Sequence, residues 1–348
     1  MKILYAIQGT GNGHLSRARE IIPILKRKGT VDILISGTQA DVSLPFEVKY
    51  TFKGLSFIFG KKGGVDWVKT YSAINSSELR RDIAQLPVEQ YDLVINDFEP
   101  VSAWACNNKK VPCIALSHQS AVLAQSAPRP LRDDIFGASV LRYYAPSTIQ
   151  YGFHFGNYQK NIFTPVIRSE VRELQSSNQK HYTVYLPAYD DGRLIKNLSV
   201  FKSVQWDIFS KHNSKIIRKD NIVIRPINND AFLNSLASCA GVLCGAGFET
   251  PAEALFLKKK VLVIPMKNQY EQQCNANALE LIGVPVVKSL KKKHHRIIKD
   301  WIESTYVPQV YYPDQTEKII DTIISENYLK DRQINKQPKE TRYEVLDN

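Results

Sequence analysis

Short apolar runs that alternate with helical segments are the feature that most narrows the folds open to this sequence. A helix is predicted at residues 15–28, where Gly29 ends it. Short continuous apolar runs are typical of strands buried inside a parallel sheet. In the first third of the chain such runs lie at residues 2–7, 31–35, 92–96 and 112–116. This alternation predicts an α/β fold built on a doubly wound parallel sheet.

The same alternation begins again in the second half, after a polar segment marked by proline. This segment runs from Thr164 to Lys180 and has the composition of an interdomain linker. Further strands are predicted at residues 182–186, 222–224, 241–244 and 260–264, and helices near 231–238, 250–257, 270–282 and 316–327. Because 348 residues exceed what one core usually organises, we expect two Rossmann-like domains that face a cleft. Their predicted limits are 1–164 and 165–329, followed by a charged, mobile tail at 330–348.

Composition excludes several classes of protein. Hydrophobic residues make up 43% and charged residues 23% of the chain, which is ordinary for a soluble globular protein. No apolar stretch approaches the roughly 18 residues of a membrane span, so we expect a cytoplasmic protein. The five cysteines are odd in number and lack Cys-x-x-Cys spacing, which argues against a disulfide framework or a zinc site. The net charge of +12 suits anionic ligands, namely nucleotide diphosphates, anionic lipid headgroups or nucleic acid.

A glycine-rich loop connects the first strand to the first helix. Glycines there let the backbone approach a ligand while helix amides point at it, so Gly11, Asn12 and Gly13 are candidates for a phosphate or acceptor loop. A dinucleotide site would need Gly-x-Gly-x-x-Gly and an acid at the end of the second strand. Here the spacing is Gly-x-Gly-x-Gly and the second strand ends Ile35-Ser36-Gly37. Nicotinamide and flavin cofactors are therefore disfavoured.

Three polar residues are candidates for acid–base and acceptor chemistry. His14 lies at the positive end of a helix dipole, which favours the neutral imidazole that a general base needs; the alternative is a surface or capping histidine. Asp97 follows the strand at 92–96, where it could orient His14 or be an ordinary loop carboxylate. His118 follows the next strand and would line the acceptor cleft at the same sheet edge. The chain has no Asp-x-Asp, so we predict no metal.

Two segments of the second half follow buried strands and are candidates for a donor site. Backbone amides from Gly247 to Thr250 would face an anion such as a diphosphate. Glu253, one turn into that helix, could accept hydrogen bonds from ribose hydroxyls or simply favour the helix dipole. About 20 residues later, Glu271 and Gln272 open a helix that would present a carboxylate and an amide to sugar hydroxyls, with a solvated helix start as the alternative. Asn275 would cap or brace that loop.

The two segments together resemble the donor-site signature of GT-B glycosyltransferases, especially the MurG-like N-acetylglucosaminyltransferases and their UDP-glycosyltransferase relatives. The matching patterns are Gly245-x-Gly247-Phe248-Glu249-Thr250-x-x-Glu253 and Glu271-Gln272-x-x-Asn275-Ala276. The amino-terminal glycine loop and the linker are also similar to theirs. The sequence departs from the family at Glu249, which replaces a neutral residue, and at residues 186–192, where a glycine-rich loop is missing.

This resemblance implies the GT-B fold, no cofactor, and a role for each part of the signature. Glu253 would bind the ribose of the nucleotide. Thr250 and the amides near Gly247 would bind the phosphates, and Glu271 and Gln272 the transferred sugar. The remaining donor-site positions implied by the resemblance are Gly245, Phe248, Glu249 and Asn275.

The implied activity is an inverting, metal-independent transfer of a hexose, such as N-acetylglucosamine, from a nucleotide diphosphate sugar, with UDP as the expected nucleotide. His14 would take the proton of the acceptor hydroxyl, with Asp97 as its partner. Two alternatives stay open: a nucleotide-sugar 2-epimerase of the same fold, and a binding subunit without catalytic activity.

The acceptor is predicted from a few apolar and basic residues of the first half. Phe52–Phe59, Lys61, Lys62 and Trp67 would suit a lipid-linked acceptor and peripheral contact with an anionic membrane face, and a buried strand beside a solvated loop is the alternative. A glycan acceptor of another kind is equally open. No aromatic residue interleaves the basic run at 291–296, so we interpret it as a solvated face and predict no nucleic-acid partner.

Overall fold

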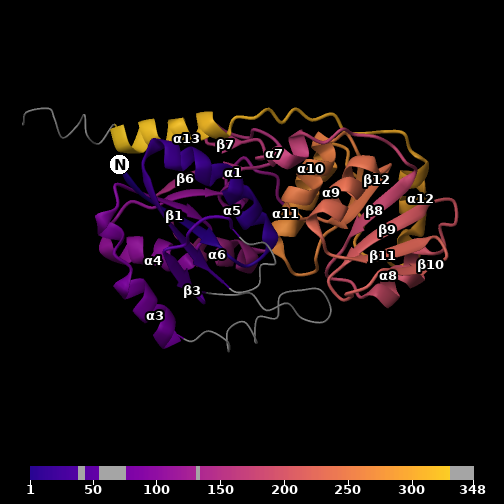
Figure 1. The fold of residues 1–348 in the computed structure, drawn as a ribbon, viewed down its shortest axis with the longest axis horizontal. Helices are drawn as coiled ribbons and strands as arrows, with labels where there is room; N and C mark the ends of the chain where they lie inside the picture. The colour runs from indigo at the N-terminus through magenta and orange to yellow at the C-terminus, as the bar shows by residue number, and fades with distance from the viewer. Residues whose placement is uncertain (38–43, 55–75, 131–133, 330–348) are drawn as a thin grey trace, which may run out of the picture.

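The chain forms two sheets, one in each half, with helices packed around them (Figure 1). The described strands pair in parallel, except β10, which runs antiparallel to β11. The computed structural model describes residues 1–37, 44–54, 76–130 and 134–329. The predicted α/β architecture of two Rossmann-like domains is confirmed. The tail predicted to be mobile lies outside the described residues. Among the described residues, no helix is both long and apolar enough to cross a lipid bilayer.

The amino-terminal sheet has seven strands in the order β3-β2-β1-β4-β5-β6-β7. The strands are β1 (Lys2–Gln8), β2 (Thr30–Ser36), β3 (Tyr50–Phe52), β4 (Leu93–Asp97), β5 (Ile114–Ser117), β6 (Ile149–Phe153) and β7 (Ile162–Phe163). The helices are α1 (Asn12–Lys28), α3 (Ser76–Gln85), η1 (Val88–Gln90), α4 (Pro100–Lys109), α5 (His118–Val122) and α6 (Ile135–Tyr144). Because β1 and β4 are neighbours with Ile7 opposite Asp97, the loop after β1 lies beside the carboxyl end of β4.

The carboxy-terminal sheet has six strands in the order β10-β11-β9-β8-β12-β13. The strands are β8 (His181–Tyr185), β9 (Gln205–Ser210), β10 (Ile217–Lys219), β11 (Ile222–Pro226), β12 (Gly241–Gly245) and β13 (Lys260–Ile264). The helices are α7 (Ser169–Arg172), α8 (Asp191–Leu198), α9 (Asn229–Ser238), α10 (Glu249–Phe256), α11 (Tyr270–Leu281), η2 (Lys292–His294), α12 (His295–Glu303), α13 (Thr316–Ile324) and η3 (Ser325–Leu329). The chain order reverses between β8 and β12, which is where ligands bind in open α/β sheets.

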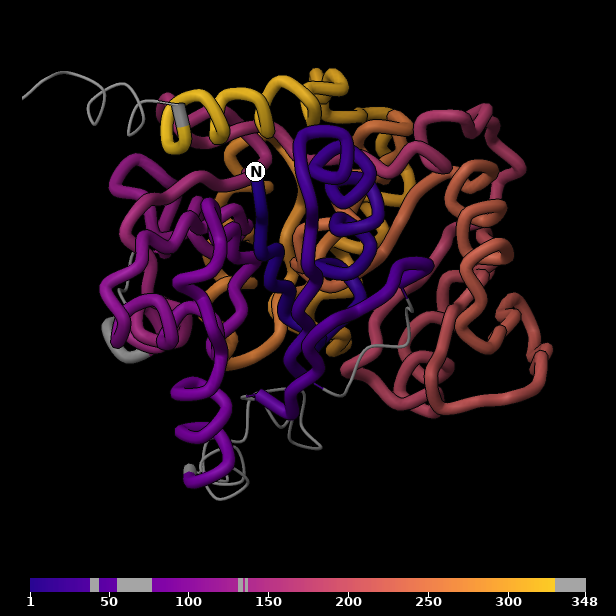
Figure 2. Tube along the Cα trace, turned by 60° about the vertical axis from the view of Figure 1, so that its left-hand side comes forward, coloured from indigo at the N-terminus to yellow at the C-terminus, as the bar shows by residue number. Residues whose placement is uncertain are grey.

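The last helices return to the amino-terminal half. Figure 1 and Figure 2 both show α13 lying beside α1. Lys28 of α1 forms a 2.7 Å ion pair with Asp321 of α13, and Tyr151 of β6 donates a 2.6 Å hydrogen bond to Glu326 of η3. Residues 316–329 are therefore part of the amino-terminal body in space, although they follow the second sheet in sequence.

Each strand predicted from the sequence is present, whereas the short edge strands β3, β7 and β10 and the longer strands β6 and β9 were not predicted. The segment Ile149–Phe153 carries a glutamine and a glycine, and Gln205–Ser210 carries an aspartate, so neither forms a continuous apolar run. Both segments form strands because they pair with a neighbouring strand: β6 pairs with β5, and β9 pairs with β8. Propensity patterns cannot report such tertiary pairing.

Candidate active site

His14 and Asp97 meet at the carboxyl edge of the amino-terminal sheet. Nδ1 of His14 lies 2.8 Å from Oδ1 of Asp97, and the Asp97 side chain is fully buried while 13% of the His14 side chain is exposed. Because the carboxylate can only accept, Nδ1 donates and Nε2 is left to accept a proton. This is the tautomer that a general base requires.

Arg17, which the sequence did not single out, is the second partner of Asp97. It lies one helical turn beyond His14, and its Nη2 donates to both carboxylate oxygens of Asp97, at 2.7 and 2.8 Å. Burial alone would raise the pKa of Asp97, but the charges of Arg17 and His14 outweigh it and hold the pKa below its usual value. Asp97 therefore stays ionised between two donors.

Arg17 also reaches the carboxy-terminal domain. Its Nη1 donates to Oε1 of Glu249, the first residue of α10, at 2.5 Å. A Cβ at Gly13 would collide with the Glu249 carboxylate, so a larger residue there would push this side chain away from its present position. Glu249, predicted at the donor site, thus contacts the amino-terminal domain and is absent from the cavity lining described below.

Gln119 joins the two domains at the exposed side of His14. Its Nε2 lies 3.5 Å from Nε2 of His14 and donates to Oε2 of Glu271 at 3.1 Å. Gln119 is 5% exposed, and its Oε1 has no hydrogen-bond partner among the described residues. An unpaired buried amide oxygen is costly, so this atom is a candidate to accept a hydroxyl of a bound sugar or acceptor.

His118 lies in the contact between the domains. It is 1% exposed, with Nδ1 2.8 Å from the carbonyl oxygen of Phe153 and Nε2 2.7 Å from Oδ1 of Asn275. Its ring stacks on Phe248 at 3.9 Å between centroids. Asn275 in turn donates to the carbonyl oxygen of Ala246, at 3.1 Å. The carboxy-terminal domain therefore covers His118, and its predicted role in lining the acceptor cleft stays a prediction.

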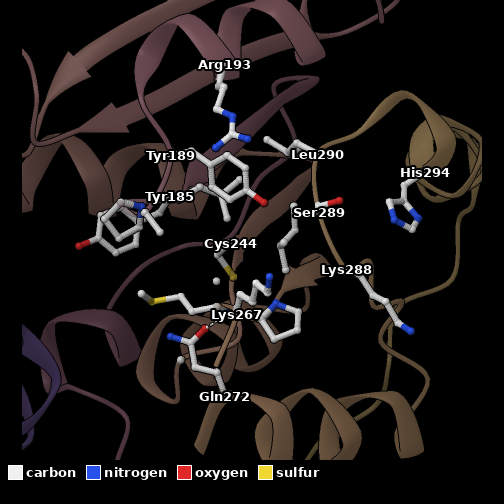
Figure 3. Close-up of a pocket in the computed structure, with 18 of the residues that line it drawn as sticks. Tyr185, Tyr189, Arg193, Cys244, Lys267, Gln272, Lys288, Ser289, Leu290 and His294 are labelled. Carbon is white, nitrogen blue, oxygen red and sulfur yellow. Dashed lines mark hydrogen bonds between the residues drawn. The ribbon is translucent and has the colours of Figure 1, made fainter. Parts of the chain in front are cut away.

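A cavity of about 1130 Å³ opens at the carboxyl ends of β8, β12 and β13 (Figure 3). Four predicted donor residues line it: Gly245, Gly247, Thr250 and Gln272. Around Gly247 a Cβ would meet nothing within 4 Å, so the backbone there is open to a ligand. Oε1 of Gln272 accepts a 2.8 Å hydrogen bond from the amide of Met266, which leaves the NH₂ group to the cavity.

Basic side chains dominate the charge of this cavity, and none of the described residues that line it is acidic. Its positively charged members are Arg193, Lys267, Lys288, Lys291 and Lys293, and His294 lies beside them with a pKa that burial and the neighbouring lysines lower. Figure 3 shows Arg193 and Gln272 approaching from opposite sides. The run at 291–296, interpreted from the sequence as a solvated face, thus contributes to the wall of a cavity. We refer to these five Lys and Arg side chains as the cationic wall.

Glu253 is not among the residues that line the cavity. It is 3% exposed, and its two oxygens accept hydrogen bonds from Nε and Nη2 of Arg168, at 2.5 and 2.8 Å. Burial raises the pKa of Glu253, while the Arg168 guanidinium favours its charged form. The linker residue Arg168 therefore already occupies the carboxylate predicted to bind ribose, and ribose binding by Glu253 stays a prediction.

The remaining predicted positions lie at the amino-terminal loop. Gly11 precedes α1 with φ of 97°, a conformation that favours glycine, and a Cβ there would meet nothing within 4 Å. Asn12 is the first residue of α1. The segment from Lys61 to Trp67, on which the lipid-linked acceptor partly depends, lies outside the described residues.

Comparison with known proteins gives one family. The model of glycosyl transferase family 1 matches residues 1–305. No curated protein matches the chain. Among solved structures, the chain is similar to UGT89C1 of Arabidopsis thaliana complexed with UDP, at 12% identity and a TM-score of 0.56, with 94% of this chain and 99% of that chain covered. It is also similar to MurG of Acinetobacter baumannii, at 14% identity and a TM-score of 0.53, with 92% and 98% covered. At such identities the likeness to solved structures shows the fold alone, and this fold is the predicted GT-B fold.

Proposed function

The chain belongs to glycosyl transferase family 1, and from this premise we propose that it moves a hexose from a nucleotide diphosphate sugar to a hydroxyl of a glycan or lipid-linked acceptor. UDP is the first nucleotide to test, because UGT89C1 and LpCGTa, two proteins of similar fold, were solved in complex with UDP. N-acetylglucosamine is the first sugar to test, because the donor motif resembles that of the MurG-like enzymes.

The observation that carries this proposal is the charge of the cavity at the β8–β12 crossover. Its lining combines the open backbone at Gly247 and the start of α10 with five Lys and Arg side chains and no acid among the described lining residues. A nucleotide diphosphate has the complementary charge, and helix amides with basic side chains are its usual partners. A neutral or cationic donor would leave the cationic wall without a counter-charge.

The reaction that we propose is a direct displacement at the anomeric carbon. The acceptor hydroxyl gives its proton to Nε2 of His14 while its oxygen bonds to that carbon. The bond from the anomeric carbon to the diphosphate oxygen breaks, the nucleotide diphosphate leaves with the electron pair, and the configuration inverts. The amides near Gly247 and the cationic wall would stabilise the charge of the leaving group, without any step that needs a metal.

Sugar recognition is proposed for the side chains between the cavity and His14. Gln272 faces the cavity, and Glu271 and Gln119 form a hydrogen bond across the two domains beside His14. The unpaired Oε1 of Gln119 supports a contact with a hydroxyl of the sugar or acceptor. Ribose binding by Glu253 would require its pair with Arg168 to open.

Cleft closure is part of the same proposal. Donor binding in one domain and acceptor binding in the other require the domains to approach, with the linker near residue 165 as the hinge and residues 316–329 moving with the amino-terminal domain. The acceptor is the least constrained part, because most of the apolar and basic segment that favours a lipid-linked acceptor lies outside the described residues. Peripheral membrane contact therefore stays a prediction.

Thermal-shift titration with nucleoside diphosphates and their sugars tests the donor assignment. We expect UDP or a UDP-sugar to raise the melting temperature, by an amount that grows with ligand concentration. The variant Lys293→Ala, in the cationic wall, should weaken binding several-fold, or about 1 kcal/mol. Lys299→Ala is the matched control, since Lys299 is 65% exposed on α12 and does not line the cavity.

Two results would contradict the donor assignment. One is that no uridine, thymidine, guanosine or cytidine diphosphate stabilises the protein. The other is that the two lysine variants weaken binding equally.

A further inference from the structure

Four charged or titratable side chains form a continuous chain from the amino-terminal base to the donor domain. His14 and Arg17 both donate to Asp97, and their nearest nitrogens lie only 3.1 Å apart. Arg17 also donates to Glu249 of α10. The side chains of Arg17 and Asp97 are 2% and 0% exposed, so water screens these charges little.

The net charge beside His14 depends on whether α10 is docked. With Glu249 in contact, Asp97, Arg17 and Glu249 sum to one negative charge. Without Glu249, the charges of Asp97 and Arg17 cancel. A nearby negative charge stabilises the imidazolium that forms when His14 takes a proton, and a neutral pair does not.

The other groups that face His14 do not reverse this dependence. On the side of α5 and α11 these are Gln119, Glu271 and His118. His118 lies 4.0 Å from Glu271, and both belong to the interface that Glu249 completes. On the sheet, Tyr5 is buried near Asp97, and its pKa is raised well above the usual value by burial and then by Asp97, so it stays neutral. The charge that docking adds next to Arg17 is therefore that of Glu249.

We propose that Arg17 is a positioning residue that couples docking of the donor domain to the ability of His14 to accept a proton. The coupling acts through the contact between Arg17 and Glu249 of the donor domain. In the docked state Glu249 offsets the positive charge of Arg17, and Asp97 then supports His14 as a base. When α10 moves away, Arg17 neutralises Asp97 and the base is weakened. The acceptor would thus be activated only when the donor domain is in place. This inference rests on the proposed transferase activity with His14 as base.

The test is the pH dependence of kcat at saturating donor and acceptor, which reports groups in the bound complex. Glu249→Gln removes the negative charge and should move the acidic limb of the profile to lower pH, by about one pH unit, with a roughly ten-fold lower plateau. Arg17→Gln leaves two negative charges and should move the same limb to higher pH by a similar amount. A packing defect alone would lower kcat without moving the limb in opposite directions.

Two further variants complete the experiment. Arg17→Lys keeps the charge but cannot contact Asp97 and Glu249 with the same geometry, so the limb should stay within a few tenths of a pH unit of the unmodified protein while kcat falls. Glu20→Gln is the control on the same helix, because Glu20 accepts a hydrogen bond from Ser169 and does not touch the chain of charges. It should leave the limb in place.

The outcomes separate this inference from the proposed function. If the unmodified protein transfers sugar and the limbs of the Glu249→Gln and Arg17→Gln variants shift in the same direction or not at all, the coupling is wrong and the transferase assignment stands. If Arg17→Gln does not fold, Glu249→Gln decides the matter alone, since 29% of the Glu249 side chain is exposed and its loss leaves no buried cavity. If the unmodified protein transfers sugar from no nucleotide donor, it is the proposed function that fails.

Discussion

The contact between the domains and the donor cavity are both rich in charge, yet they are built in opposite ways. In the contact, the buried Arg17 has Asp97 as its carboxylate partner, and in the adjoining linker the half-buried Arg168 has Glu253. In the cavity, the cationic wall is largely exposed, and no acid of the described residues lines it. Buried charges that are paired with opposite charges fix the positions of their side chains. Exposed charges of one sign attract a ligand of the opposite charge.

The largest expected effect is on kcat and comes from Asp97, in the contact between the domains where buried charges are paired. Asp97→Asn keeps the size of the side chain but removes the charge that holds both His14 and Arg17. We expect kcat to fall on the order of 10³-fold, because the base loses the group that orients it and stabilises its charged form. Steady-state kinetics at saturating donor and acceptor measure this loss.

The matched control for Asp97 is Asp32 of β2. Asp32→Asn removes a carboxylate from the same sheet, where its partners are Lys49 and Tyr91. It should leave kcat within about two-fold, as expected for a change away from the site. UDP binding should survive in both variants, since neither residue lines the cavity. Equal loss of kcat in the two variants would show that Asp97 matters only for folding.

How the two charged regions arise explains which parts of the site could be predicted from the sequence. His14 and Asp97 each follow a strand end, and parallel strands place such ends at one sheet edge, so their proximity was predictable. Arg17 left a signal that was not used: it falls on the apolar face of α1, where Leu15, Ala18 and Ile21 are buried. A charge among such residues needs a buried partner.

The other contacts leave no local signal. Arg168 and Glu253 are far apart in sequence, and nothing in either segment indicates that they pair. Glu253 fits a donor-site motif, whereas its contact with the linker follows from how the second domain folds. The cationic wall is exposed, so its lysines look like any solvated face until the fold curves α8, β13 and the segment before α12 around one cavity. Exposed residues carry no periodic pattern that would report this.

The next largest effect is on stability and comes from the ion pair of Arg168 with Glu253. Arg168→Gln leaves Glu253 buried without its counter-charge, which should cost about 3 kcal/mol near neutral pH. The cost depends on pH because burial raises the pKa of Glu253 in the folded state. Protonation removes the penalty at low pH, and the penalty grows as pH rises above the unfolded value of about 4.5. Urea unfolding at pH 5 and pH 8 should therefore show the larger loss at pH 8.

A neutral pair is the control for that pH dependence. Arg168→Gln combined with Glu253→Gln removes both charges, so its stability relative to the unmodified protein should be nearly the same at the two pH values. A loss from the single variant that is the same at pH 5 and pH 8 would contradict a buried, charged Glu253.

The smallest expected effect is that of salt on the affinity of the donor cavity, where the exposed positive charges have no acidic partner among the described lining residues. Raising NaCl from 50 to 500 mM shortens the screening length from about 14 Å to about 4 Å, which weakens attraction between exposed lysines and a diphosphate. We expect UDP affinity, measured by calorimetry, to fall about three- to ten-fold. The kcat at saturating donor should change less than about two-fold, because the charges around His14 are buried and salt screens them little.

The lysine variants are the control for this salt effect. Lys293→Ala should reduce the salt dependence of affinity, and Lys299→Ala should not. A salt effect on kcat as large as that on affinity would mean that the interdomain charges open to solvent during turnover, and the contrast between the two regions would then not hold in the working enzyme.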